Sequence, residues 1–416
     1  MRVSDVLFSK GLGGFFFDDQ SAIRESPPKD GFLYRGTPKT PGYSRLREPS
    51  ESVSVMLILE DGQVAIGDCC AVQYSGVGGR EPFFRGGALV SWADRDARSR
   101  LVGLECSSFR ESSNFVRSAF SSIRGDVPKA FLYGITQALL DAAARSTGLT
   151  MAEVIAQEYS LPLIPSPIRL YAQSGDDWET NVDKMILKRV DVLPHGLVND
   201  PKRKVGARGE ILRSLVASVR KRVLQLRGDS SYQPELHFDV YGTLSCVFRN
   251  DLESIADYLG TLEDEASPFV LRIEAPIDAG SLEAQLDGMS ALRRLMRRKG
   301  LRTEIVVDEW CNSLGEIKMF CDAGAADMVQ VKMPDLGALD DSISALLYCH
   351  AKGVKALQGG SCTETDISAR VSVHIALACR PYQLLAKPGM GVDEGVMIVR
   401  NEMERALALL GRGAGG

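Results

Sequence analysis

Eight short β-like runs, separated by longer stretches with helical spacing, follow one another from about residue 166 onward, and this rhythm restricts the fold more than any other feature of the chain. Alternation of this kind is typical of βα units that build a parallel sheet. Eight consecutive units predict a (β/α)8 barrel of the α/β class. The runs lie near residues 169–174, 189–195, 235–242, 269–276, 303–310, 327–334, 354–361 and 382–389.

One of the intervening stretches, residues 281–300, has a clear helical pattern. Its apolar side chains recur at spacings that place them on one face, as expected of a helix that packs on a barrel. Basic residues precede Gly300, and both features predict the end of the helix there. The side chains on the predicted apolar face are Leu282, Leu286, Met289, Leu292 and Met296.

The chain before residue 160 has a mixed pattern. Residues 52–69 alternate between apolar and polar side chains around Asp61 and Gly62, which predicts a β-hairpin, and later stretches have helical spacing. The 416 residues also exceed what one ordinary domain needs. We therefore predict an α+β domain over residues 1–160 and a barrel domain over residues 161–416.

Composition and charge argue against several classes of partner. The formal net charge of −5 gives nucleic acid and anionic membranes no electrostatic attraction to the protein. The nine cysteines are an odd number without a C-x-x-C spacing, which indicates reduced thiols and a cytoplasmic location rather than a zinc site. We expect no export signal and no membrane segment, because the apolar runs are short.

Polar side chains end the predicted strands, where the reactive groups of such barrels lie. Asp239, Glu274 and Asp308 finish three consecutive strands, so their carboxylates are expected to converge. Without a cation they would repel one another, and carboxylate oxygens suit Mg²⁺, so the trio predicts a magnesium site completed by water and a substrate carboxylate. In chain order the strand ends carry Gln173, His195, Asp239, Glu274, Asp308, Lys332, the Ser361-Cys362 pair and Lys387.

Lys332 is the predicted base beside this metal. Gln330 and Lys332 are two residues apart and therefore share one face of a strand. We expect burial and a nearby dication to disfavour the charged amine, so that it accepts a proton next to a substrate carboxylate, with the metal stabilising the enolate. His195 would face the opposite side of the intermediate, although a structural role as a turn or core histidine stays open. Cys362 lacks an evident base partner that would make it a nucleophile. We therefore expect it to line the pocket and to contribute its backbone N–H.

Longer motifs surround these residues and carry a resemblance. With them the chain resembles the methylaspartate ammonia-lyase family of the enolase superfamily over nearly its entire length. The motifs are GFFFDDQSAI (14–23), GDCCAVQYSGVGGR (67–80), YGITQALLDA (133–142), AQSGDD (172–177), HFDVYGT (237–243), RIEAP (272–276), DEWCN (308–312), GGSCTET (359–365) and AKPGMGVDEG (386–395).

The resemblance implies a capped (β/α)8 barrel, usually dimeric, that reversibly eliminates ammonia from L-threo-3-methylaspartate to give mesaconate, a step of glutamate degradation. It implies Mg²⁺ bound by Asp239, Glu274 and Asp308, with a monovalent cation such as K⁺ as activator. It implies that Lys332 is the base that abstracts the proton and that His195 is its counterpart on the opposite face of the substrate. The residues that it places around the substrate are Gln173, Gln330, Ser361, the backbone of Cys362, Gln73 from the N-terminal domain and Leu385 as an apolar wall.

Two positions depart from the pattern of the family. Ser361 stands where the family has threonine, and Leu357 where tyrosine is expected. Ser361 keeps the hydroxyl, whereas Leu357 is expected to reshape the pocket, so amine scope or rate would differ. A racemase or acid-sugar dehydratase of the same superfamily and a non-catalytic metal-binding barrel are the alternatives, because a metal-bound enolate serves several chemistries. The extended motifs favour the ammonia-lyase.

Overall fold

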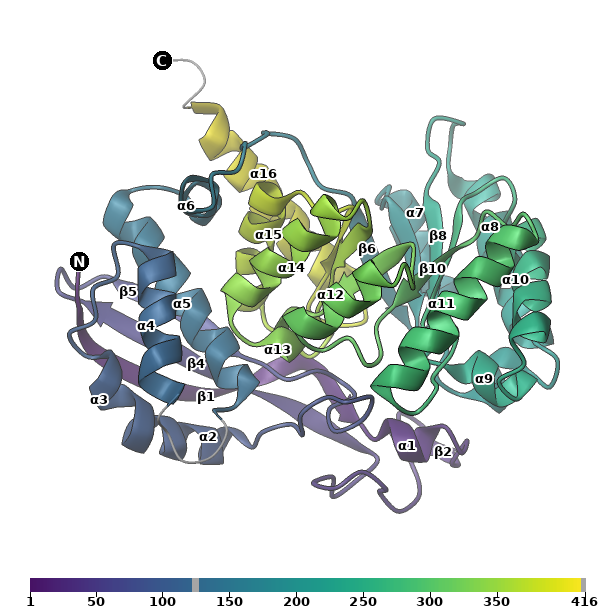
Figure 1. Cartoon of the computed structure of the whole chain (residues 1–416), viewed down its shortest axis with the longest axis horizontal. Helices are drawn as coiled ribbons and strands as arrows, with labels where there is room; N and C mark the ends of the chain where they lie inside the picture. The colour runs from purple at the N-terminus through teal and green to yellow at the C-terminus, as the bar shows by residue number, and fades with distance from the viewer. Residues whose placement is uncertain (122–126, 413–416) are drawn as a thin grey trace.

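The computed structural model describes residues 1–121 and 127–412. Its two main sheets are a three-stranded antiparallel sheet near the N-terminus and a closed parallel barrel of eight strands. Figure 1 shows the N-terminal sheet and its helices, in purple and blue, beside the barrel, whose elements run from teal to yellow. In the described part of the chain, no helix combines the length and apolarity needed to cross a bilayer.

The N-terminal sheet is built from β1 (Val3–Asp18), β4 (Arg47–Leu59) and β5 (Val64–Cys69), in the order β1-β4-β5. The hairpin predicted around Asp61 and Gly62 is confirmed: β4 and β5 pair antiparallel, and Gly62 has a positive φ of 85° at the turn. The remaining elements of this part are β2 (Lys29–Asp30), β3 (Leu33–Tyr34), α1 (Gln20–Ile23), α2 (Gly86–Trp92), a π-helical turn (Ala93–Ala97), α3 (Arg98–Leu101), α4 (Phe109–Ser121), α5 (Lys129–Thr147) and α6 (Met151–Glu158).

Helix α5 packs closely on this sheet, and two glycines make the approach possible. A Cβ atom at Gly134 would lie 2.6 Å from the backbone nitrogen of Cys69, and one at Gly67 would overlap the carbonyl oxygen of Gly134. Tyr133, the neighbour of Gly134, is fully buried. The close contact therefore fixes the helix that carries Tyr133 relative to the sheet.

The barrel predicted from the sequence rhythm is confirmed. Its strands follow chain order around the barrel, and the last one pairs with the first. Each predicted run overlaps one of them, and only β6 and β7 end one residue beyond the predicted run. The strands are β6 (Leu170–Gly175), β7 (Val192–Gly196), β8 (Glu235–Asp239), β9 (Leu271–Glu274), β10 (Glu304–Val307), β11 (Met328–Val331), β12 (Lys355–Gln358) and β13 (Gln383–Ala386).

Helices follow every barrel strand and cover its outside (Figure 1). In α11 (Leu282–Arg298) Met289 and Met296 are buried as predicted, Leu282 is partly buried, and Gly300 has a φ of 75° just beyond the helix end. The other elements are α7 (Trp178–Leu187), a π-helical turn (Pro201–Val205), α8 (Glu210–Leu226), α9 (Thr243–Phe248), α10 (Leu252–Ala266), α12 (Leu314–Asp322), α13 (Met333–Leu336), α14 (Leu339–Ala351), α15 (Asp366–Cys379) and α16 (Asp393–Arg412).

An apolar layer fills the barrel interior below the polar strand ends. Successive side chains of a strand alternate between inside and outside, so Met328, Gln330 and Lys332 follow one another up the inner face. On β6, the apolar Tyr171 is likewise followed on the inner face by the polar Gln173. The layer therefore forms a floor under the polar groups. Its members are Tyr171, Val192, Val306, Met328, Leu357 and Leu385.

Candidate active site

Two of the three predicted metal ligands lie side by side at the carboxyl end of the barrel. Asp239 is the last residue of β8, Glu274 is the last residue of β9, and the two are partners in the register of these strands. One ligand atom each from Asp239, Glu274 and His195 lie within 4.8 Å of one another. These three buried groups form a compact donor set.

Asp308, the third predicted ligand, directly follows β10 but has other partners in this structure. Lys332 Nζ donates to its Oδ2 at 2.7 Å, and Arg80 Nη2 lies 3.0 Å from its Oδ1. Burial raises the pKa of the Asp308 carboxyl, but Lys332 and Arg80 outweigh burial and hold the pKa below its usual value. Asp308 is therefore ionised and shared between two cations.

The net pKa shifts of the other two carboxyl groups have the opposite sign to that of Asp308. Burial and the charges of Glu309 and Asp308 raise the pKa of Asp239 well above its ordinary value. Burial and the charges of Asp239 and Asp308 do the same to the pKa of Glu274. Both shifts arise because like charges crowd one buried place, and a divalent cation would remove that repulsion.

The two carboxylates of this donor set, Asp239 and Glu274, fit Mg²⁺, which prefers carboxylate oxygens. Glu274 Oε2 has no hydrogen-bond partner among the described residues, and His237 Nε2 lies 3.1 Å from it. Glu274 Oε1 accepts a hydrogen bond from Gln330 Nε2. Glu274 thus keeps one unused, buried carboxylate oxygen beside Asp239, as a metal ligand requires.

Lys332 lies at the N-terminus of α13, directly after β11, and its side chain reaches the cavity. Burial and Arg80 lower the pKa of this amine, but Asp308 and Asp335 outweigh them, so its pKa is raised. Burial thus disfavours the charged amine, as expected, but the direct ion pair with Asp308 opposes burial and leaves the net pKa raised.

His195 stands on β7, four strands away from β11 in the ring of eight, and therefore opposite Lys332. Its Nε2 lies 3.5 Å from Asp239 Oδ2, and its ring lies against that of Tyr171. Burial and the positive charge of Lys332 lower the pKa of His195 to about 4. The imidazole is thus neutral near pH 7.

A cavity with an empty volume of about 340 Å³ lies between Lys332 and His195. Of the side chains predicted to contact substrate, all but one line it. The exception, Leu385, lies in the apolar layer below, together with Leu357. The side chain that departs from the expected tyrosine therefore lies in the floor, beneath the cavity wall. The lining residues are Val72, Gln73, Tyr74, Arg80, Gln173, His195, Asp239, Tyr241, Gln330, Lys332, Gly360, Ser361 and Cys362.

Three functional candidates were not predicted from the strand ends. Arg80 reaches the cavity from a glycine-rich loop of the N-terminal part, and its Nε donates to Asp335 Oδ2 at 2.9 Å. Glu309 is buried, and burial followed by the charge of Asp308 raises its pKa to about 7. His237 stacks on Tyr171 beside Glu274. Of these three residues, only Glu309 has a signal in the sequence, namely its position next to Asp308. A contact from a distant loop, such as that of Arg80, leaves no local sequence pattern.

Comparisons with known proteins cover the whole chain. Family models described as methylaspartate ammonia-lyase N-terminus and methylaspartate ammonia-lyase C-terminus match residues 1–160 and 162–412. The chain belongs to the methylaspartate ammonia-lyase family. Methylaspartate ammonia-lyase 2 of Carboxydothermus hydrogenoformans is 52% identical over 100% of both chains.

Solved structures of methylaspartate ammonia-lyases agree with this membership. The Citrobacter amalonaticus enzyme, crystallised with (2S,3S)-3-methylaspartic acid, has a TM-score of 0.94 and 46% identity, over 99% of this chain and 100% of its own. The magnesium complex of β-methylaspartase from Clostridium tetanomorphum has a TM-score of 0.90 and 46% identity, with the same coverage. The protein is thus an enzyme of this lyase family, with the family's capped barrel.

Proposed function

We propose that the protein catalyses the reversible elimination of ammonia from L-threo-3-methylaspartate to give mesaconate. The observation that carries this proposal is the placement of Lys332 and His195 on opposite sides of a cavity that Asp239 also lines, with the carboxylate of Glu274 beside that of Asp239. The membership of the chain in the lyase family and the substrate bound to the Citrobacter amalonaticus relative support the choice of substrate.

Asp239, Glu274 and Asp308 are the proposed ligands of Mg²⁺. The magnesium complex of the Clostridium tetanomorphum relative supports this choice of metal. When bound, Mg²⁺ supplies positive charge that stabilises the carboxylate as the neighbouring carbon loses its proton. A monovalent cation such as K⁺ is proposed as activator.

Lys332 is the proposed base that removes the proton from C3, the carbon that bears the methyl group. To do so it must be neutral, and Arg80 favours the neutral amine because its charge lowers the pKa of Lys332. The electron pair of the broken C–H bond is first delocalised into the neighbouring carboxylate as an enolate. It forms the double bond between C2 and C3 as the C–N bond breaks, and the electron pair of the C–N bond leaves with ammonia. His195, neutral near pH 7, is the proposed base on the opposite face.

The cavity wall provides the proposed substrate contacts. Gln73, Gln173, Ser361 and the backbone of Cys362 line it. Gln330 Oε1 has no hydrogen-bond partner among the described residues, so it is free to accept a hydrogen bond from the substrate ammonium group. Leu385 would support the methyl group from the apolar layer.

The wider setting of the enzyme is part of the same proposal. Residues 1–160 would form the cap and residues 161–416 the catalytic barrel of a cytoplasmic homodimer that serves glutamate degradation. The nine cysteines are all free, which suits a reducing compartment. The substrate is a small amino-dicarboxylate, and neither nucleic acid nor a membrane is a proposed partner.

The decisive test is incubation of the purified protein with Mg²⁺, K⁺ and L-threo-3-methylaspartate. We expect ultraviolet absorbance to rise as the conjugated diacid forms, with release of equimolar ammonia. A panel of acid sugars and amino acids, assayed in parallel for dehydration and for racemisation, tests the alternatives within the superfamily. Folded, metal-loaded protein that releases no ammonia would exclude the proposal.

A further inference from the structure

A second lysine follows a barrel strand directly but is not available for catalysis. Lys387 comes after β13, as Lys332 comes after β11, yet its side chain is fully buried. Its Nζ donates to Glu364 Oε1 at 2.8 Å and to the carbonyl oxygen of Gly359 at 3.2 Å. A buried charge of this kind persists only with a well-placed partner, so Lys387 serves to hold Glu364.

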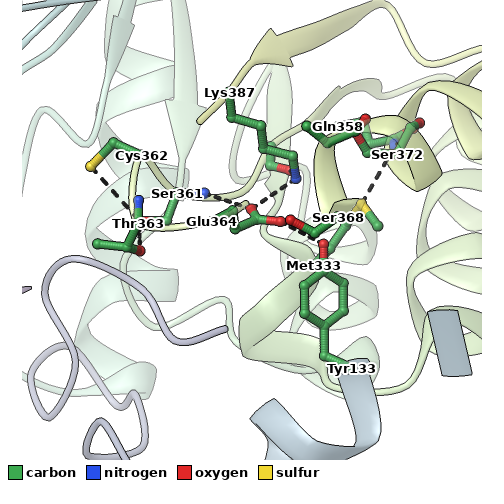
Figure 2. Close-up of polar contacts among 12 residues, drawn as sticks. Tyr133, Met333, Gln358, Ser361, Cys362, Thr363, Glu364, Ser368, Ser372 and Lys387 are labelled. Carbon is green, nitrogen blue, oxygen red and sulfur yellow. Dashed lines mark hydrogen bonds and ion pairs between the residues drawn. The ribbon is translucent and has the colours of Figure 1, made fainter. Parts of the chain in front are cut away.

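Glu364 in turn joins three parts of the chain. Its Oε1 also accepts from the backbone N–H of Ser361 at 2.9 Å, and its Oε2 accepts from Tyr133 Oη at 2.5 Å. Tyr133 belongs to α5 of the N-terminal part. Figure 2 shows Lys387 and Tyr133 reaching the Glu364 carboxylate from opposite sides. One carboxylate thus connects the barrel, the cap and the loop that carries Ser361.

The loop of residues 359–365 is shaped around this ion pair. A Cβ atom at Gly360 would overlap both Glu364 Oε1 and Lys387 Nζ. On its other side the loop contacts the N-terminal part, since Ser361 Oγ accepts from the backbone N–H of Gln73 at 3.0 Å. Bare backbone at position 360 is therefore needed for Ser361 to occupy its place in the cavity wall.

From these contacts we infer that Tyr133, Glu364 and Lys387 are positioning residues, which fix the loop 359–365 so that Ser361 and Cys362 face the substrate. The inference rests on the proposed function, in which Ser361 and Cys362 bind the substrate. Because neither of them takes part in bond breaking, loss of their placement weakens binding of substrate and transition state alike. KM is thus the parameter that changes, and kcat is not.

The test compares Tyr133→Phe and Lys387→Met with a control, Arg117→Met. Arg117 lies on α4 and forms ion pairs with Asp340 and Asp341 of α14, so the control removes a contact between the N-terminal part and the barrel that involves no residue of the loop. In Tyr133→Phe we expect KM for 3-methylaspartate to rise roughly tenfold, the loss of one hydrogen bond to a charged group, with kcat little changed. Mg²⁺ affinity, measured by titration calorimetry, should be unchanged.

Hydrogen-deuterium exchange gives a readout that does not depend on the substrate. Amides within residues 359–365 should exchange faster in Tyr133→Phe than in the wild type and should be unaffected in Arg117→Met. Unchanged exchange and unchanged KM in Tyr133→Phe would overturn the inference, and so would equal changes in the control. If Lys387→Met fails to fold, Tyr133→Phe still decides. Inactive wild-type protein would instead refute the proposed function, while the exchange experiment would still test the placement of the loop.

Discussion

Replacement of Lys332 by alanine separates metal binding from proton abstraction. The amine donates to Asp308 Oδ2 at 2.7 Å, and Arg80 Nη2 lies 3.0 Å from the other oxygen of the same carboxylate. Lys332→Ala therefore removes the proposed base but leaves Asp308 with a cationic partner, so the protein should fold. Loss of a general base lowers the rate by roughly 10²- to 10⁴-fold. We expect a fall in kcat of this size for L-threo-3-methylaspartate.

Magnesium affinity provides the internal control for this experiment. Lys332 competes with a cation for Asp308, so Mg²⁺ should bind to Lys332→Ala at least as tightly as to the wild type, as measured by titration calorimetry. His195→Ala is the matched variant on the opposite side of the cavity, and it should retain more activity on the same isomer. The reasoning is refuted if Lys332→Ala keeps a kcat within about threefold of the wild-type value, because loss of a general base typically lowers the rate by roughly 10²- to 10⁴-fold.

Three further predictions follow from individual contacts. Glu274→Gln removes a ligand charge beside Asp239 and should weaken Mg²⁺ binding by more than roughly tenfold, measured by calorimetry; unchanged affinity would exclude Glu274 as a ligand. Ser281→Ala removes the N-cap of α11 and should lower the free energy of unfolding by about 1 kcal/mol in urea titrations, with kcat unchanged. Burial raises the pKa of Glu402, but His374 and Arg405 outweigh burial and lower it to about 2. Stability from Glu402 is therefore complete above its unfolded pKa of 4.5 and lost as pH falls towards 2, so Glu402→Gln should flatten the melting temperature over that range.

The strand-end side chains show how far local pattern reaches. Alternation along a strand depends only on neighbouring residues, and parallel strands of a closed barrel end at one edge. This is why spacing alone brought Asp239, Glu274, His195 and Lys332 to one place. Spacing did not predict that Asp308 would pair with Arg80, because that contact joins residues more than two hundred positions apart.

The two lysines at strand ends mark the division between sequence and structure. The sequence by itself determined the barrel, the end of the barrel that carries the polar groups and the family resemblance, because periodicity and motifs are local properties of the chain. Lys332 and Lys387 occupy equivalent positions after their strands, so their sequence positions do not distinguish them. Only the tertiary structure shows that Lys332 lines the cavity whereas Lys387 pairs with Glu364. The reason is that packing between distant segments determines the partner of a buried charge.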